Sequence, residues 1–589
     1  MLIGLFALAL PAQNWLPQLP GPVDSAPNGF WYGPGCGGLP GTRSTISVSP
    51  AMRPGRLVTM QVDATPPSAV ATLMIGWDAQ DWLGLTLPLP LDSVGMPGCH
   101  LMVAPVVSIP FVGSTLGSDF VSYTVPADPV LVAAPLFFQT LFQQTVPLSY
   151  FQPPAGLGVS RGYTTRVEPS GTPTTLQSSI SQHGITFQFA NPVPVGQFVN
   201  GDYFVVGPAT VVGMTPPCAL QAGRVVNGAM VNPDPSIKIQ GYDSQLFDPG
   251  DYQTSRNVAW GLSAQSPLYL GPNQSLIKVI SNTDPQHLPA LQTCSVLTTL
   301  YETPPQGSFR PPYAGLDHAV RFDVQMLDLS VLPEVTPPAA RPDLLLMAAN
   351  FERPWLDHAP GWGSRYMHPV DNMPDYGRDL AALYNEAALM CLTTGPDTEK
   401  RELAMRLVQI GIDFFGNVEG GAFWEGTGGH GSGRKLPILL AGQLLGDAKM
   451  LSVGVDYPSY RMPDGTNMVR FGEDGQTFYV EQTGAGEFNW GHGGYDSSHV
   501  GLADFGFSHM HQPQFDDVTW TGNSYRRCCT ANGWIGAVLY ARMTGLVDDW
   551  NHPALFDYTD RYATIETAGW TLSWLGWTEA MWHQYRPNY

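Results

Sequence analysis

The chain has 589 residues, with 49 acidic and 28 basic side chains and a net charge of −21. This length exceeds what one hydrophobic core ordinarily serves, so we expect two to four domains. The acidic balance argues against nucleic-acid binding through a general basic surface, and an anionic ligand must instead meet a local cluster of cations.

The first 14 residues form a signal-like segment. Residues 1–12 are an apolar run ending in small residues, which is typical of the hydrophobic part of a secretion signal. The run is too short to span a bilayer, and no later segment has the length and apolarity of a membrane helix. We therefore expect an exported protein, secreted, periplasmic or at the cell surface. A buried N-terminal strand is the alternative.

Residues 28–153 are predicted to form a β-sandwich module, because short apolar runs such as 57–62 alternate with Pro and Gly turns. Cys36 and Cys99 lie in such turns, and we expect them to form a disulfide, which export permits. Three motifs resemble a module of secreted proteins from planctomycete-like bacteria. They are GCGG at 35–38, PGC at 97–99 and FFQ at 137–139. The resemblance does not imply the module's function, and carbohydrate binding and packing both stay open.

A second β-rich domain is expected over residues 160–335. Asn200-Gly201 and Asn227-Gly228 are each flanked by apolar runs, which is the pattern of a β-hairpin turn. The proline-rich stretch 301–313 indicates a rigid connector near the end of this domain.

From residue 342 to 589 the pattern becomes helical. Residues 375–394 place Leu380, Tyr384 and Cys391 on one helical face. Further helices are predicted at 398–415, 434–445, 533–544 and 571–583. Long loops rich in Gly, Trp, His and Tyr separate them.

Helices separated by such loops resemble the (α/α)-toroid polysaccharide lyases and, less specifically, the toroid glycoside hydrolases. The resemblance implies a cleft built by the loops that precede the inner helices. The predicted fold is thus a multidomain α+β chain, with β-sandwich-like N-terminal domains followed by an (α/α) toroid, complete or incomplete.

Three loops of the helical region combine His, Tyr or Asn with Arg. The first is 368–379, and the second is 424–435, where the glycine-rich sequence GGHGSGRK opens onto a helix. Such a loop allows close backbone approach and can direct amides and cations at an anion. The third comprises 490–496 together with His509, His511 and Tyr525-Arg526-Arg527.

This mixture suits β-elimination on a uronic acid. The sugar's carboxylate must be neutralised before its neighbouring proton can be removed, and a second group protonates the leaving oxygen. We expect His430 or Tyr376 to be the base and Tyr495 or Tyr525 the acid, with Asn372 and Arg434 on the carboxylate. Further substrate contacts are predicted at Lys435, Arg378, His492 and Trp490. The expected partner is an acidic polysaccharide.

Other readings of the same residues stay open. Hydrolysis would need a pair of carboxylates from among Asp371, Asp379, Glu425, Asp474 and Asp496. β-Elimination requires no cofactor, but a structural Zn²⁺ or Ca²⁺ ion is an alternative use of His492, His499, His509, His511 and His552. A non-catalytic glycan-binding surface protein is a third possibility. The sequence lacks a P-loop.

Overall fold

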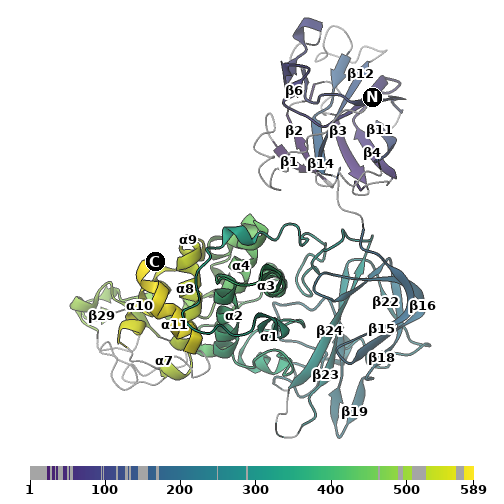
Figure 1. Ribbon diagram of the computed structural model, residues 1–589. Helices are drawn as coiled ribbons and strands as arrows, with labels where there is room; N and C mark the ends of the chain where they lie inside the picture. Colours follow the sequence, from purple (N-terminus) through teal and green to yellow (C-terminus); the bar gives the residue numbers. More distant parts are fainter. Residues whose placement is uncertain are drawn as a thin grey trace. The chain divides into compact units, whose positions relative to one another are not determined.

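A computed structural model describes most of the chain, in two compact units formed by residues 1–171 and 172–589 (Figure 1). The described residues are 23–26, 29–33, 35–36, 44–49, 52–53, 57–94, 96, 99–114, 117–126, 131, 134–143, 157–166, 171–248, 250–284, 286, 290–461, 465–488, 495–506, 525–565 and 576–589. The signal-like segment 1–14 lies outside them. Within these ranges, no α-helix is both long and apolar enough to cross a bilayer.

The N-terminal unit contains two antiparallel sheets that share one apolar core. The larger has the order β1 (Val23–Ala26), β2 (Gly29–Tyr32), β14 (Gly162–Arg166), β12 (Pro135–Gln143), β5 (Val70–Gly76) and β10 (Val107–Val112), with β13 (Leu157–Val159) paired to β12. The smaller has the order β11 (Ser118–Thr124), β4 (Leu57–Asp63) and β3 (Thr45–Ser49). Two short hairpins are formed by β6 (Asp81–Trp82) with β7 (Leu85–Thr86) and by β8 (Leu89–Pro90) with β9 (His100–Leu101).

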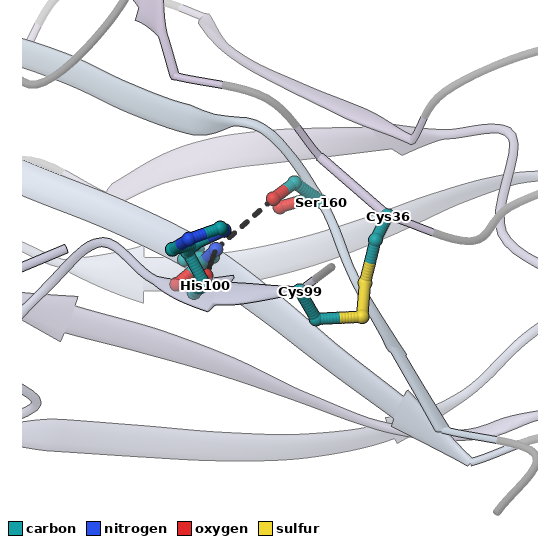
Figure 2. Close-up of a disulfide and its surroundings, with 5 residues drawn as sticks. Cys36, Cys99, His100 and Ser160 are labelled. Atoms are coloured by element: carbon teal, nitrogen blue, oxygen red, sulfur yellow. Dashed lines mark hydrogen bonds between the residues drawn. A yellow bond between two sulfur atoms is a disulfide. The ribbon is translucent and has the colours of Figure 1, made fainter. Parts of the chain in front are cut away.

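The predicted disulfide between Cys36 and Cys99 is confirmed (Figure 2). Beside it, Gln139 is fully buried and donates to the carbonyls of His100 and Ser160 at 2.9 and 3.1 Å, while its Oε1 accepts from the Met102 amide at 2.8 Å. The FFQ motif therefore supplies a buried amide whose hydrogen bonds offset its desolvation.

The second unit begins with an eight-stranded sheet. Its order is β21 (Ala229–Val231), β23 (Gln274–Ser281), β24 (Leu291–Leu300), β17 (Tyr203–Val206), β16 (Ile185–Gln197), β18 (Ala209–Thr215) and β22 (Leu268–Leu270), with β15 (Thr175–Gln182) paired to β16. Only β17 and β24 run parallel. A separate hairpin joins β19 (Ala219–Gln221) to β20 (Arg224–Val226).

The two Asn-Gly steps behave differently. Asn200-Gly201 turns the chain between β16 and β17, which pair as predicted. Asn227-Gly228 does not make a hairpin, because β20 before it pairs with β19 and β21 after it pairs with β23. Asn227 has a φ of 59° and its side chain accepts from Ser281 N at 2.9 Å, so this step is a corner between two sheets.

Eleven α-helices are described in the rest of the second unit. They are α1 (Leu344–Ala349), α2 (Gly377–Cys391), α3 (Asp397–Glu419), α4 (Lys435–Leu445), α5 (Ala448–Leu451), α6 (Val453–Asp456), α7 (Tyr525–Cys528), α8 (Ile535–Thr544), α9 (Val547–Trp550), α10 (Pro553–Ile565) and α11 (Gly576–Tyr585). Four of the five predicted helices are confirmed within a few residues, and of the fifth, 571–583, the described part 576–583 is helical while 571–575 lie outside the described residues. Three small hairpins pair β25 (Ser459–Arg461) with β26 (Asn467–Val469), β27 (Thr477–Tyr479) with β30 (Ala503–Phe505), and β28 (Gln482–Gly484) with β29 (Glu487–Phe488). Most helices share one apolar core, and the toroid itself stays a prediction.

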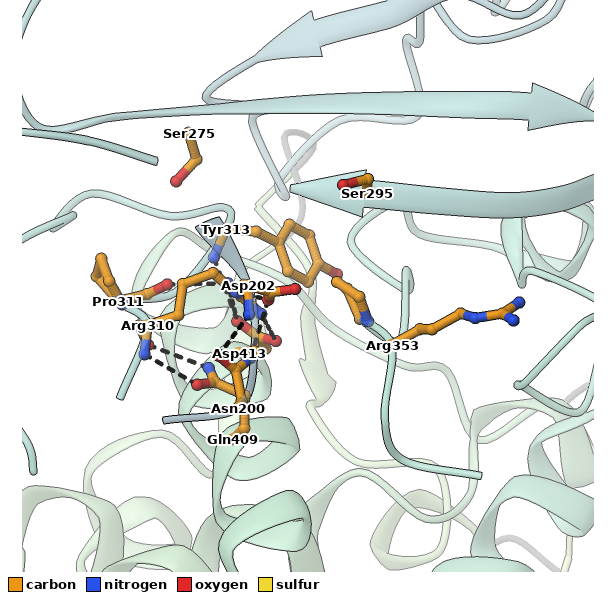
Figure 3. A network of polar contacts seen from close by, with 12 residues as sticks. Asn200, Asp202, Ser275, Ser295, Arg310, Pro311, Tyr313, Arg353, Gln409 and Asp413 are labelled. Carbon is orange, nitrogen blue, oxygen red and sulfur yellow. Dashed lines mark hydrogen bonds and ion pairs between the residues drawn. The ribbon is translucent and has the colours of Figure 1, made fainter. Parts of the chain in front are cut away.

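The sheet and the helices, expected as separate domains, belong to one compact unit. Figure 3 shows a buried charged network between them. Arg310 Nε lies 2.6 Å from Asp202 Oδ2 in the β16–β17 turn, and its Nη2 lies 2.6 Å from Asp413 Oδ2 on α3. All three side chains are fully buried, so each charge depends on the others for its solvation.

Candidate functional site

The first two predicted loops and the segment after α7 meet through glycines. A Cβ at Gly429 would lie 1.7 Å from the Cys529 carbonyl oxygen and 2.8 Å from the Tyr376 ring. A Cβ at Gly377 would lie 2.1 Å from the His430 carbonyl oxygen. Only glycine permits these approaches, so the glycine-rich sequence brings His430 and Tyr376 side by side.

Trp362 stands at the centre of the resulting surface group. Its side chain is 52% exposed, and its ring meets the rings of His430 and Tyr376 edge-on, at centroid distances of 5.6 and 6.1 Å. The Arg365 guanidinium lies 3.5 Å from the Trp362 ring centroid, and the Arg378 guanidinium lies 5.3 Å from that of Tyr376. We call Trp362, Arg365, Tyr376, Arg378 and His430 the Trp362 cluster.

The stacking of Arg365 on Trp362 follows from local backbone geometry. Both residues lie in a 3₁₀-helix, η6 (Trp362–Met367), in which side chains three positions apart eclipse one another. The Tyr366 ring also lies close to the guanidinium, with its centroid 4.1 Å away and its hydroxyl accepting from Nη2 at 2.6 Å. The guanidinium therefore contacts two aromatic rings.

The two arginines of the cluster differ in charge pairing. Arg378 donates from Nε to Asp379 Oδ1 at 2.7 Å. Arg365 forms no ion pair within the part of the chain that the structure describes, and its Nη1 is buried without a hydrogen-bond partner. Arg365 is therefore a cation whose charge no described carboxylate meets.

Beneath the cluster lies a buried carboxylate, Asp357. Its Oδ1 lies 2.9 Å from His368 Nε2, and its Oδ2 accepts from Arg434 Nε at 2.6 Å. Burial disfavours the ionised form of Asp357, but the charges of Arg434 and His368 outweigh it and lower the pKa of this carboxyl to about 2. Asp357 is thus an anion at neutral pH.

Lys435 also points inward. Its Nζ donates to Asp474 Oδ2 and to the Trp550 carbonyl, each at 2.5 Å, and the indole of Trp550 donates to Asp474 Oδ1 at 2.8 Å. The adjacent Glu473 is buried and accepts from the Gly433 amide at 3.2 Å. Burial, reinforced by the charge of Asp474, raises the pKa of Glu473 to about 7.

Among the predicted site residues, the structure brings His430, Tyr376 and Arg378 together. Arg434 and Lys435 are only 2% and 1% exposed and are held by carboxylates, so the substrate contact expected of them does not fit this geometry. Asn372 is 9% exposed and donates to the Arg353 carbonyl at 3.2 Å, although its Oδ1 has no partner.

Tyr495 belongs to a different group of side chains. Its hydroxyl donates to Asp504 Oδ2 at 2.6 Å, and its ring contacts those of Phe488 and His499. Trp490, His492, His509, His511 and the side chain of Tyr525 lie outside the described residues.

The residues proposed for the alternative chemistries have the following contacts. These residues contain no group of three or more His, Cys, Asp or Glu side chains placed to hold a metal ion. His499 bonds the backbone and side chain of Asp496, and His552 bonds Thr477 at 2.9 Å. Of the candidate acids, Asp371, Asp379 and Asp474 are each bonded to a neighbouring cation.

Arg365, Asp357 and Trp362 are not among the site residues predicted from the sequence. The run GWGSRYM at 361–367 carries the relevant signal, an aromatic residue three positions before an arginine. That signal becomes informative only once the segment is known to be a 3₁₀-helix. No known protein-family model matches the chain, and no curated protein matches it significantly in sequence.

Proposed function

We propose that this protein is an exported polysaccharide lyase that binds a uronic-acid-containing polymer over the Trp362 cluster and cleaves it by β-elimination. The observation that carries the proposal is the contact of Trp362 with His430, Tyr376 and Arg365 at once. A half-exposed indole offers a stacking face for a sugar ring. The neighbouring guanidinium of Arg365 offers a positive charge for a carboxylate.

The proposed chemistry follows from these groups. Arg365, assisted by Arg378, neutralises the uronate carboxylate, which makes the adjacent C5 proton more acidic. His430 or Tyr376 removes that proton, and the C5–H electron pair passes into the carboxylate as an enolate. Collapse of the enolate forms a C4–C5 double bond and breaks the bond from C4 to the glycosidic oxygen, which takes a proton from an acid.

The test is a screen of uronate polymers such as alginate, pectate, glucuronan, ulvan and glycosaminoglycans, followed by two simultaneous readings. Ultraviolet absorbance detects the unsaturated product, and a reducing-end assay detects every cleavage. We expect both signals with at least one polymer. We also expect His430→Ala to lower kcat by about 10²–10⁴-fold, the usual contribution of a general base.

The matched control is His583→Ala, because His583 is 61% exposed and pairs with Glu579 on α11. It should leave the rate unchanged. New reducing ends without ultraviolet absorbance would replace the proposal with hydrolysis. Tight binding of a polymer that is never cleaved would replace it with a glycan-binding role.

A further inference from the structure

Asp357 contacts both halves of the proposed site through two different side chains. One carboxylate oxygen meets His368, which precedes α2, and the other meets Arg434, which precedes α4. All three side chains are no more than 2% exposed. The buried contacts therefore link two loops that are far apart in the sequence and carry Tyr376 and His430.

The His368 branch leads to Tyr376. His368 Nδ1 lies 3.0 Å from the Pro374 carbonyl oxygen, and its Nε2 lies 2.9 Å from Asp357 Oδ1. A carbonyl and an ionised carboxylate can only accept, so a ring nitrogen of His368 that bonds either of them does so as a donor. The ring thus fixes the backbone two residues before Tyr376.

The Arg434 branch leads to His430. Arg434 Nε donates to Asp357 Oδ2 at 2.6 Å, which fixes the guanidinium plane. Its Nη1 then donates to the carbonyls of His430 and Ser432, at 2.7 and 2.5 Å. The guanidinium therefore holds the backbone of His430 itself.

We infer that Asp357 is the positioning residue of this site and sets the spacing between Tyr376 and His430. The inference deepens the proposed function and rests on it only for its link to activity. An arginine and a carboxylate buried merely for packing would not need the histidine, nor donors aimed at the two loop backbones.

Hydrogen exchange measured on the full-length protein tests the inference without any substrate. Asp357→Asn removes one acceptor, so amides in both 374–378 and 427–434 should exchange at least about tenfold faster. Two further variants separate the branches. His368→Gln should keep a donor near Asp357 but lose the hydrogen bond to the Pro374 carbonyl, so amide exchange should become faster only in 374–378. Arg434→Lys should keep the positive charge but lose the hydrogen bonds to the carbonyls of His430 and Ser432, so amide exchange should become faster only in 427–434.

Asp202→Asn is the matched control. Asp202 is also a fully buried carboxylate that accepts from an arginine Nε at 2.6 Å, but its partner is Arg310. We expect this variant to lower overall stability and to leave the relative exchange of both site segments unchanged. The positioning role would be overturned if Asp202→Asn accelerated amide exchange in 374–378 and 427–434 as much as Asp357→Asn does. It would also be overturned if Asp357→Asn accelerated exchange in only one of these segments.

Activity then provides a separate reading. With a polymer that the wild-type protein cleaves, Asp357→Asn should lower kcat more than it raises KM, because Trp362 and Arg365 remain to bind the sugar. If no polymer is cleaved, the lyase proposal fails while the exchange result still stands. If exchange in Asp357→Asn matches the wild type, the positioning role fails even in an active lyase.

Discussion

Arg365 and Arg434 belong to loops around the same tryptophan but have opposite environments. Arg365 contacts two aromatic rings and has no ion pair among the described residues, whereas Arg434 is 2% exposed and bound to Asp357. Burying a guanidinium is tolerable only when a carboxylate and acceptors replace its water. The sequence shows the arginines but not Asp357, which lies 77 positions from Arg434. For that reason the sequence placed Arg434 at the substrate carboxylate, although the structure buries its side chain.

The exposed face of Trp362 yields a prediction at the residue scale. Trp362→Ala should weaken binding of the cleaved polymer about 3–10-fold, because it removes one stacking face. Isothermal titration calorimetry measures the effect. Trp260→Ala is the control, since Trp260 is 43% exposed and lies outside the Trp362 cluster. Equal affinities of the two variants would contradict the placement of the sugar on Trp362.

Glu473 yields a prediction about pH. Its pKa rises from an ordinary 4.5 to about 7 in the folded protein, so folding favours its protonated form. Its contribution to stability is therefore complete below about pH 4.5 and is lost as the pH rises through about 7. Glu473→Gln mimics the protonated form at every pH. Between these two pH values, the variant should gain about 1–3 kcal/mol relative to the wild type in urea denaturation.

If the difference in unfolding free energy between Glu473→Gln and the wild type did not change over that pH range, the pKa of Glu473 would not be raised in the folded protein. The contribution of Asp357 to stability depends on pH in the opposite direction, because its folded-state pKa is lowered to about 2. Its contribution is present above its ordinary value of 3.8 and is lost as the pH falls towards 2.

At the scale of elements, the sequence predicted the long helices well. Regular spacing of Leu380, Tyr384 and Cys391 found α2, and the same periodicity found α3. Both helices bury an apolar face in one core, so the spacing of their apolar residues in the sequence follows directly from how they pack. Short elements such as η6 leave no such record, and η6 is the element that carries Trp362 and Arg365.

The turn before α4 yields a prediction about loop packing. Gly433 has a φ of 94°, and a Cβ there would lie 2.6 Å from Ala381 Cα on α2. Gly433→Ala should lower the free energy of unfolding by about 2–4 kcal/mol, through backbone strain and overpacking together. Gly545→Ala, after α8, has a similar φ of 79° but open space around the new Cβ.

Gly545→Ala should therefore cost only about 1 kcal/mol, the cost of the strained backbone alone. Urea denaturation of both variants measures the difference. Equal losses of unfolding free energy in the two variants would mean that α2 moves aside at Ala381, and that the turn before α4 is not tightly packed against α2.

At the scale of the whole molecule, the sequence predicted where strands give way to helices but not how the chain divides. The described contacts separate residues 1–171 from 172–589. The change from β to α lies inside the second unit, where Arg310 contacts Asp202 and Asp413 across 108 and 103 positions. Pairing over such distances leaves no local pattern in the sequence.

The two units should unfold separately. We expect two calorimetric transitions. The double variant Cys36→Ser/Cys99→Ser should lower the free energy of unfolding of the N-terminal unit by about 2–4 kcal/mol, and should lower the midpoint temperature of that unit's transition only. The transition of residues 172–589 is the internal control in the same scan. A single transition, or a shift of both, would show that the units are thermodynamically coupled.

The buried network of Arg310 also limits how this architecture could be inherited. A gene fragment that encoded only the helices would leave Asp413 in the core without Arg310, and one that encoded only the sheet would leave Arg310 without Asp413. Breaking a buried ion pair in this way costs about 3–5 kcal/mol, a large part of the stability of an ordinary domain. The sheet and the helices therefore form one indivisible unit of recombination, and shuffling of modules in this chain is expected near residue 171, where the two compact units divide.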